Sequence, residues 1–298
     1  MSEPVTYLTN FKDVDPATLP RYSVSEHQLI TSSPQDLYYS YVMGLKPKKT
    51  ADYFTRGSYL HGLMERYWIA RHNNETFSLE QAGVEVRREL MEERQAVVGE
   101  VDRLQIESLF ARWAKEQDPK AEAVAVIGGV PAIELEFYAD IGLRTVDDEP
   151  VAFYGFIDLV TIADGVLKIG EHKTASRAWS QTQLQLNLQG PVYAQAVEAL
   201  TGVTVEEVQF NFFYKDRFES KSIYPTAGNR AALVEEMQKG GWWRDVGGIY
   251  RSFHWSSSMS PFANLNALAL QGIDPTTFIE EHYDVDEEKR DAYARWAR

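Results

Sequence analysis

The chain has 298 residues, of which 44% are hydrophobic, a formal net charge of −14 and no cysteine. It is long enough to bury a large core, and its acidity argues against a generic nucleic-acid binder because negative charge repels the phosphate backbone. No apolar run reaches transmembrane length, and the first residues lack the basic and apolar regions of a signal peptide. We therefore expect a cytoplasmic protein with no membrane association.

The elements expected along the chain fall into three consecutive parts. Residues 1–120 are predicted to be mostly helical, residues 121–225 carry the strands, and residues 226–298 are mainly helical again. No repeat, low-complexity segment or linker forces a division of the chain. We predict a single domain over residues 1–298 of the α/β (α+β) class, with a mixed β-sheet flanked by helices.

Two local features precede the first long helix. Ser33 is a suitable helix N-cap, because Pro34 follows at the first helical position and Asp36 lies in the first turn. Basic side chains then gather as candidate phosphate contacts, and these are Lys46, Lys48, Lys49 and Arg56. Short lysine runs are equally often solvated loops.

The segment "SYLHGLMERYW" is predicted to form an amphipathic helix. Its apolar residues recur at the spacing of one buried stripe, and they are Leu60, Leu63, Met64, Tyr67 and Trp68. His61 and Glu65 lie one turn apart on the flank of that stripe. A lone histidine there is more often a hydrogen-bonded boundary residue than a metal ligand, so the helix alone leaves both interpretations open. The mixed-sign charges of residues 79–117, which follow, are typical of a solvated outer face.

The segment "GFIDLVTIADGVLKIGEHKTA" predicts a β-hairpin. Its two arms are rich in β-branched and aromatic residues, and Asp164-Gly165 between them is a strong signal for a two-residue type I′ turn. Such a turn places Ala163 opposite Val166. The register of every other pair in the hairpin follows from this one.

Ionisable side chains converge on one face of this hairpin. The register places Asp158 opposite Glu171, and because side chains alternate along a strand, Lys173 shares the face of Glu171 while His172 points to the other side. Opposed carboxylates repel one another. A divalent cation such as Mg²⁺ or Mn²⁺ would offset that repulsion. The alternative is a solvent-facing hairpin with a cross-strand ion pair between Asp158 and Lys173.

A helix is expected after the hairpin, followed by a strand near residues 205–216. Gln189 and Tyr193 are four residues apart and would project from one face of that helix. Pro191 removes a helical hydrogen bond, so we expect the helix to start or kink there, and Gly202 is a suitable terminator.

Three of these motifs together resemble a known family. Asp158 followed by Glu171-His172-Lys173 is similar to the signature of the PD-(D/E)XK nucleases, with Ile157 where the family name has proline. "RGSYLHGLMERY" and the Gln189-x-x-x-Tyr193 pair resemble motifs of the RecB-like branch, and all three occur in the family order between residues 56 and 193. The resemblance implies a restriction-endonuclease-like fold and hydrolysis of DNA.

The same resemblance implies roles for individual residues. It implies that Mg²⁺ or Mn²⁺ is held by His61, Asp158, Glu171 and the main-chain carbonyl of His172, that Lys173 is the catalytic lysine, and that Gln189 and Tyr193 contact the DNA backbone or support the hairpin. Glu134 and Glu136, on the strand before the hairpin, are weaker candidates for acids that support the ligands. The expected substrate is linear or single-stranded DNA, and the expected activity is that of an exonuclease of phage or bacterial replication, recombination or repair, with partner proteins from those processes.

Many RecB-like nucleases carry a [4Fe-4S] cluster, and the resemblance places its ligand positions at Ser33, Ser257, Ser260 and Asn266. Thiolates are the ligands that such a cluster requires, so none is expected here. In its place we predict that the two ends of the chain meet through hydrogen bonds and packing around Phe262 and Leu265. Two other functions stay open: a nuclease-fold DNA-binding or recombination partner without turnover, and an unrelated interaction protein.

Overall fold

The computed structural model describes residues 7–48, 52–117, 122–175, 179–180, 183–184, 187–214, 216–245 and 260–290. The chain forms two compact units. The first unit comprises Met1–Asn10, Thr50–Ala139 and Gly155–Arg230, and the second comprises Phe11–Lys49, Asp140–Tyr154 and Ala231–Arg298. These units interleave along the sequence, whereas three consecutive parts were expected. The interpretation as a single domain stays a prediction.

A mixed β-sheet forms the framework of the first unit. Its strand order is β1 (Leu8–Thr9), β7 (Ile133–Ala139), β8 (Ala152–Ala163), β9 (Val166–Thr174), β10 (Val205–Phe213) and β11 (Phe218–Ile223). Strand β9 is antiparallel to β8 but parallel to β10, and β10 is antiparallel to β11. The short strand β4 (Ala123–Val124) also pairs with β8, while β5 (Val126–Ile127) and β6 (Val130–Pro131) pair with each other. Strand β2 (Arg21–Tyr22) of the second unit pairs with Ala152 and Phe153, the part of β8 that belongs to that unit. The predicted mixed α/β class is confirmed.

Strands β8 and β9 form the predicted hairpin. Asp164 and Gly165 have φ angles of 51° and 79°, and positive φ at both central residues is the mark of a type I′ turn. Ala163 pairs with Val166, and the ladder continues in the same register to the pair of Leu159 and Gly170. The predicted register is confirmed for the pairs from Ala163 and Val166 to Leu159 and Gly170, and the ladder ends one residue before Asp158 and Glu171.

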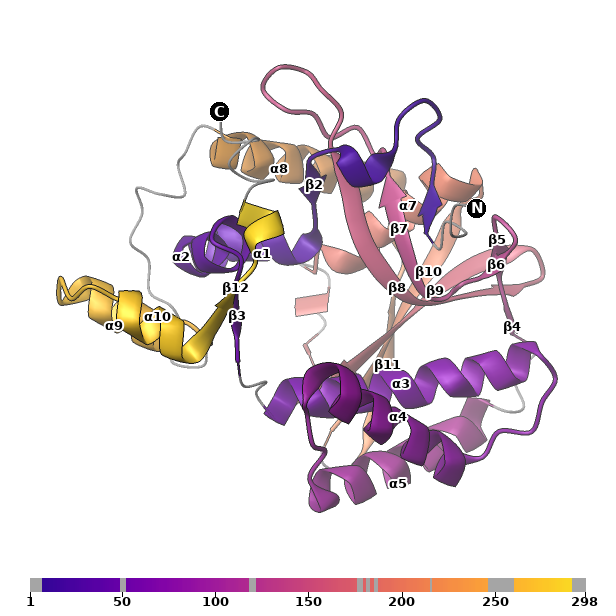
Figure 1. Ribbon diagram of the computed structural model, residues 1–298. Coiled ribbons are helices and arrows are strands. Elements are labelled where there is room, and N and C mark those ends of the chain that lie inside the picture. The colour runs from indigo at the N-terminus through magenta and orange to yellow at the C-terminus, as the bar shows by residue number, and fades with distance from the viewer. Residues whose placement is uncertain are drawn as a thin grey trace, which may run out of the picture. The chain divides into compact units, whose positions relative to one another are not determined.

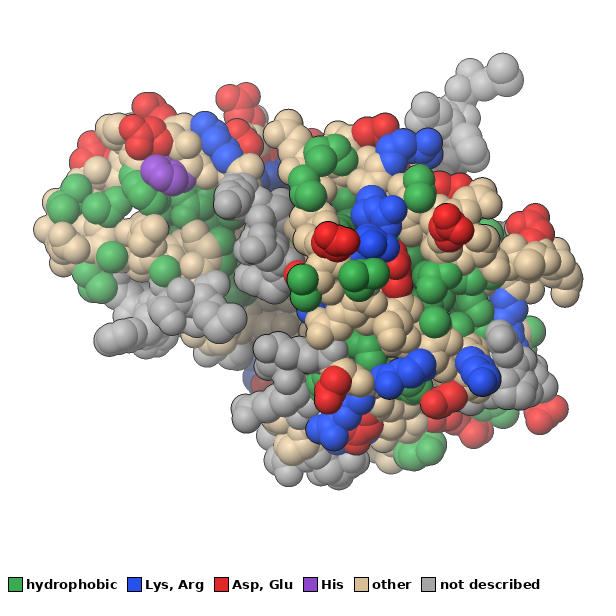
Figure 2. Space-filling model, turned by 90° about the horizontal axis from the view of Figure 1, so that it is seen from below, with side chains coloured by type: hydrophobic (Ala, Val, Ile, Leu, Met, Phe, Trp, Pro, Cys, Tyr) green, Lys and Arg blue, Asp and Glu red, His purple; other side chains and the backbone are tan. Residues whose placement is uncertain are grey.

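Three helices cover one face of this sheet (Figure 1): α3 (Asp52–His72), α4 (Leu79–Arg94) and α5 (Glu100–Gln117). The predicted apolar stripe of α3 is buried in their shared core, which also takes in Trp113 of α5, Leu159 of β8 and Phe213 of β10. Charged side chains of α4 and α5 form ion pairs such as Arg103 with Glu107. On the face seen in Figure 2, Lys and Arg side chains are interspersed with Asp and Glu.

Helix α7 (Gln189–Thr201) packs on the opposite face of the sheet from α3. It starts at Gln189, as the position of Pro191 predicted, because a residue in the first helical turn has no helical partner for its N–H. Its second residue is glycine because a Cβ at Gly190 would lie 2.7 Å from Ile223 Cδ1 and 3.3 Å from Phe210. Phe210 and Phe213 are an odd number of residues apart on β10 and therefore point to opposite faces.

The second unit is built from short elements. They are η1 (Pro16–Thr18), α1 (Val24–Ser32), α2 (Pro34–Leu37), the π-helix η2 (Tyr38–Val42), β3 (Leu45–Pro47), α9 (Ala263–Leu270), α10 (Thr276–His282) and β12 (Tyr283–Val285), together with most of α8 (Ala227–Asp245). Strand β12 pairs antiparallel with β3. Among the described residues, no helix combines the length and hydrophobicity that a membrane crossing needs.

Distant parts of the sequence meet in this second unit. Phe262 and Leu265 are buried in one cluster with Tyr39, Leu45 and Tyr283, so the predicted packing of the chain ends is confirmed. Asn266 Nδ2 also donates to Asp36 Oδ1 over 3.4 Å.

Ser33 occupies the N-cap position of α2 with Pro34 at the first helical position, as expected, but its side chain makes no capping hydrogen bond. The buried Ser33 hydroxyl has no partner among the described residues. The position is therefore that of an N-cap, without the interaction that usually stabilises one. Ser257 lies outside the described residues.

We predict that Gly62→Ala destabilises the first unit although alanine is the better helix former. A Cβ at Gly62 would lie 2.6 Å from Val86 Cγ1 of α4, and overpacking of this kind costs about 1–3 kcal/mol, against a gain of about 1 kcal/mol in helix propensity. In urea unfolding, Gly62→Ala should reduce the free energy of unfolding by about 1 kcal/mol. Combining it with Val86→Ala should cost less than the two separate losses added together. Strict additivity would show that α3 and α4 are not held at this distance by glycine.

Candidate active site

The hairpin supplies two buried carboxylates. Asp158 and Glu171 are only 7% and 2% exposed. Beyond the pair of Leu159 and Gly170, the Asp158 side chain takes over as the acceptor for β9, because its Oδ2 accepts the backbone N–H of His172 over 2.6 Å. The Asp158 carboxylate is thus held in place by a hydrogen bond from the backbone of β9.

His61 of α3 reaches the same place. Its Nδ1 lies 3.0 Å from Glu134 Oε1 and 3.5 Å from Asp158 Oδ1, and its Nε2 lies 3.1 Å from the carbonyl oxygen of His172. Both ring nitrogens therefore face acceptors. A neutral imidazole has only one N–H to donate, so this geometry fits the imidazolium form.

The charge state of the site follows from these distances. Burial lowers the pKa of His61, but the carboxylates of Asp158, Glu134 and Glu171 outweigh it and raise the pKa to about 9. Burial, assisted by the charge of Asp158, raises the pKa of Glu171 to about 7. Burial also raises the pKa of Asp158. Three acidic side chains thus lie close together, and the positive charge of His61 offsets part of their negative charge.

Lys173 and Gln189 both bind Glu171. The Lys173 ammonium donates to Glu171 Oε1, and Gln189 Nε2 at the start of α7 donates to the same oxygen over 2.7 Å. The two nearby carboxylates raise the pKa of Lys173 in spite of its burial. The other oxygen, Oε2, is buried and has no partner among the described residues. A buried carboxylate oxygen without a hydrogen-bond partner is energetically unfavourable, and a bound cation would supply the missing interaction.

The donor set is suited to a divalent ion. One ligand atom from each of His61, Glu134 and Asp158 lies within 4.8 Å of the other two. The carboxylates suit Mg²⁺ and Mn²⁺, and the imidazole is a ligand typical of transition metals. Of the predicted ligands, the structure brings His61, Asp158 and the His172 carbonyl together directly, while Glu171 is hydrogen-bonded to Lys173 and Gln189.

Glu134 of β7 was expected as an acid that supports the ligands, and it contacts the predicted ligand His61 directly. Such a contact suits a supporting acid, although its distances to His61 and Asp158 also allow Glu134 to bind the ion itself. Its φ of 44° is unusual for a non-glycine residue in a strand. The sequence signal was the pair of acids Glu134 and Glu136 at alternate positions of a strand whose other residues are apolar or aromatic. Glu136 instead accepts a hydrogen bond from Tyr138 over 3.2 Å.

The side chains of Tyr193 and His172 are packed into the protein. The Tyr193 ring meets the edge of Phe137 at 5.7 Å, and a Cβ at Gly155 would lie 3.1 Å from the Tyr193 hydroxyl. The His172 ring packs against Trp113 at 5.7 Å, and burial lowers its pKa to about 3. His172 therefore offers its backbone to the site, and Tyr193 supports the sheet next to it.

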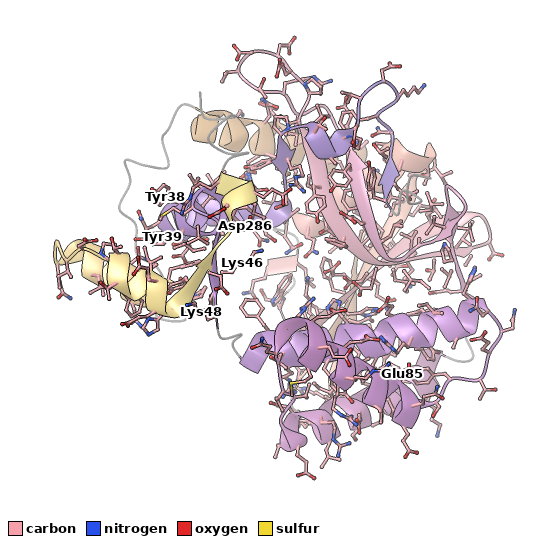
Figure 3. The ribbon with its side chains drawn as sticks, in the orientation of Figure 1. Tyr38, Tyr39, Lys46, Lys48, Glu85 and Asp286 are labelled. Atoms are coloured by element: carbon pink, nitrogen blue, oxygen red, sulfur yellow. The ribbon has the colours of Figure 1, made fainter. Side chains whose placement is uncertain are left out.

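The predicted basic contacts have intramolecular partners. Arg56 Nη1 lies 2.5 Å from Asp102 and 2.8 Å from Gln105. Lys46 lies 3.1 Å from Asp286, and Lys48 Nζ donates to the Glu280 carbonyl over 2.7 Å, both in the second unit (Figure 3). Lys49 lies outside the described residues. The roles of these basic residues in DNA binding stay predictions.

Comparisons with known proteins place the chain in a family. The family model described as "PD-(D/E)XK nuclease superfamily" matches residues 21–296. No curated protein matches. Among solved structures, the chain is similar to a candidate exonuclease from Eubacterium rectale, with 13% identity over 79% of this chain and 82% of that one and a TM-score of 0.45. It is also similar to SSO0001, with 10% identity over 78% of each chain and a TM-score of 0.36.

We predict that divalent metal stabilises the protein and does so more at higher pH. Glu171 and His61 have raised pKa values, so in metal-free protein their favourable contributions to the free energy of unfolding are lost as pH rises through about 7 and about 9. A metal ion needs both groups deprotonated and competes with those protons. Millimolar Mg²⁺ or Mn²⁺ should therefore raise the melting temperature more at about pH 8 than at about pH 6.

Single substitutions test whether the metal-dependent rise in melting temperature arises at these residues. Asp158→Ala should abolish the metal-dependent rise, while Glu136→Ala, whose side chain bonds Tyr138, should keep it. The measurement is a set of melting curves with metal and with EDTA. A wild-type protein that melts at the same temperature in both would rule out a shared metal site.

Proposed function

Since the chain belongs to the PD-(D/E)XK nuclease superfamily, we propose that it is a divalent-metal-dependent deoxyribonuclease that hydrolyses phosphodiester bonds of DNA. The observation that supports this most is the convergence of Asp158, Glu171 and Lys173 on one face of the hairpin with His61 of α3 beside them. Buried acids paired with a lysine next to a histidine form a constellation that phosphodiester hydrolysis can use.

Each residue has a role in this proposal. His61, Glu134, Asp158 and the carbonyl of His172 hold the ion, and Glu171 contributes its partnerless Oε2. A bound Mg²⁺ or Mn²⁺ supplies Lewis acidity and a water of lowered pKa.

The remaining residues act on the substrate or on Glu171. The ammonium of Lys173, held by Glu171, stabilises negative charge on the phosphate oxygens as water attacks phosphorus and the bond to the leaving oxygen breaks. Gln189 orients Glu171 from the start of α7, and Tyr193 packs against Phe137 beneath the site. Gln189 and Tyr193 are thus positioning residues in this proposal.

We further propose an exonuclease of the RecB-like branch that acts on linear or single-stranded DNA in the cytoplasm. The support is the order of the Arg56–His61, Asp158–Lys173 and Gln189–Tyr193 motifs. Such nucleases belong to phage and bacterial replication, recombination and repair, so partner proteins from those processes are expected. The absence of cysteine leaves no thiolate for an iron–sulfur cluster.

One assay tests the proposed function. Purified protein is incubated with end-labelled linear, circular and single-stranded DNA in the presence of Mg²⁺, Mn²⁺ or EDTA. Metal-dependent release of short products from ends, with circular DNA intact, is expected. Metal and DNA binding without any cleavage would instead favour a non-catalytic DNA-binding or recombination partner.

We predict that Lys173→Ala separates binding from catalysis. The substitution removes a charge that matters most in the transition state but leaves the carboxylates in place. It should keep the metal-dependent rise in melting temperature, keep DNA binding within a few-fold, and slow cleavage by roughly a hundredfold, about 3 kcal/mol. Lys173→Met, which retains the apolar stem, should behave alike. Cleavage at the wild-type rate by a folded Lys173→Ala protein would remove this lysine from the mechanism.

A further inference from the structure

The backbone of His172 is held on its β8 side by side chains of the candidate active site. The ladder between β8 and β9 ends at Leu159 and Gly170. Two residues further along β9, the N–H of His172 donates to Asp158 Oδ2 over 2.6 Å, and its carbonyl oxygen lies 3.1 Å from His61 Nε2. The direction of this carbonyl, a proposed ligand of the ion, therefore does not follow from pairing with the backbone of β8.

The side chain of His172 begins a row of polar groups on the face of the sheet opposite to Glu171 and Lys173. His172 of β9 pairs with Asn211 of β10, which pairs in turn with Ser220 of β11. The Ser220 hydroxyl donates to Asn211 Oδ1 over 2.6 Å, and Asn211 Nδ2 lies 3.4 Å from His172 Nδ1. An amide nitrogen can only donate, so Nδ1 is the acceptor and the ring proton is on Nε2. These three side chains form what we call the polar row.

Stability does not account for the polar row. His172 and Asn211 are only 1% and 4% exposed, and the His172 ring meets the ring of Trp113, which belongs to the aromatic core of α3, α4 and α5, at 5.7 Å. Nε2 of His172 is buried and has no hydrogen-bond partner among the described residues. Apolar side chains would leave no buried N–H without an acceptor and would pack at lower cost. Polar groups kept here at such a cost indicate a role in the site on the other face of the strand.

We propose that the polar row positions the backbone of His172, so that its carbonyl faces the ion and the metal affinity of the site is raised. The inference rests on the proposed function, because the ion is that of the nuclease site. Hydrogen bonds are directional, so those of Asn211 fix the rotation of the His172 ring, and the ring shares its Cα with the carbonyl. Removing a partner that orients a metal ligand commonly weakens metal binding by about 10- to 100-fold.

Binding of Mn²⁺ to the protein without DNA tests this role. Asn211→Leu keeps the approximate size of the side chain but removes its hydrogen bonds to His172 and Ser220. It should raise the Kd for Mn²⁺ about tenfold in isothermal titration calorimetry. It should also lower the free energy of unfolding in urea with EDTA, because polar groups of His172 and Ser220 lose their partner. Ser220→Thr, which keeps the hydroxyl, should leave the Kd within about twofold of the wild-type value.

Replacing the whole polar row separates positioning from stability. The triple variant with His172→Leu, Asn211→Leu and Ser220→Ala leaves none of the row's polar atoms unpaired. Its free energy of unfolding should therefore recover to that of the wild type or above. Its Kd for Mn²⁺ should stay raised about tenfold, because apolar packing does not fix the direction of the carbonyl. A purely structural row would instead give a Kd that recovers together with the stability.

The metal-free protein offers a readout that needs no ion. In Asn211→Leu, the His172 amide, which is bonded to Asp158, should exchange with solvent deuterium about tenfold faster than in the wild type. The amide of Ile169, which lies within the ladder of β8 and β9, should exchange at the wild-type rate. Nuclear magnetic resonance under native conditions resolves the two amides.

Thr161→Val is the matched control. Thr161 of β8 is 2% exposed and its hydroxyl donates to Glu122 over 3.4 Å, so valine should reduce stability without changing the Kd for Mn²⁺. A folded Asn211→Leu protein with the wild-type Kd, or a triple variant whose Kd recovers with its stability, would overturn the proposal. If such a protein still cleaves DNA, the nuclease function stands and only the positioning role is lost. A wild-type protein that binds no Mn²⁺ would contradict both.

Discussion

The site depends on how two buried carboxylates, with a half-buried third beside them, are kept in an apolar sheet. Asp158 and Glu171 lie where hydrophobic residues would pack at lower cost, since burial and the charges of neighbouring acids favour their neutral forms. Glu134 lies beside them. Without metal, the compensating charges are the imidazolium of His61 and the ammonium of Lys173. These two cations therefore stabilise the carboxylates in the structure. A metal ion that replaced the proton of His61 would convert the ion pair between His61 and the acids into a reactive centre.

The surrounding scaffold places those charges accurately. The type I′ turn sets the hairpin register, and the Asp158 carboxylate then replaces a backbone acceptor for His172. On one side, the aromatic core of α3, α4 and α5 brings His61 to the end of the ladder. On the other, the start of α7 at Gln189 presents an amide to Glu171. The main chain of one residue, His172, receives contacts from both Asp158 and His61, so its backbone groups link the hairpin to the helix.

Local signals predicted the hairpin and its contents because a two-residue turn fixes every later pair. The alternation of a strand placed Asp158, Glu171 and Lys173 together, and Pro191 marked where α7 begins. The contact between His61 and Glu134 could not be found in this way, because it joins α3 to β7 through a residue with a φ of 44° that no periodicity encodes. The lysines before α3 were candidates for phosphate contacts on spacing alone. In the fold, Lys46 and Lys48 are engaged with Asp286 and with a carbonyl of α10, partners that lie more than two hundred residues away in the sequence.

Because these lysines contact groups of the protein itself, they limit the positive charge that this acidic chain can offer to a polyanion such as DNA. Lys173 is bound to Glu171 and Lys221 to Glu219 and the Trp179 carbonyl, so these cations near the site already neutralise or orient groups of the protein itself. Long-range attraction to phosphate is then weak. In the proposed function, affinity for the phosphate would instead arise at short range, from a divalent ion held among the carboxylates.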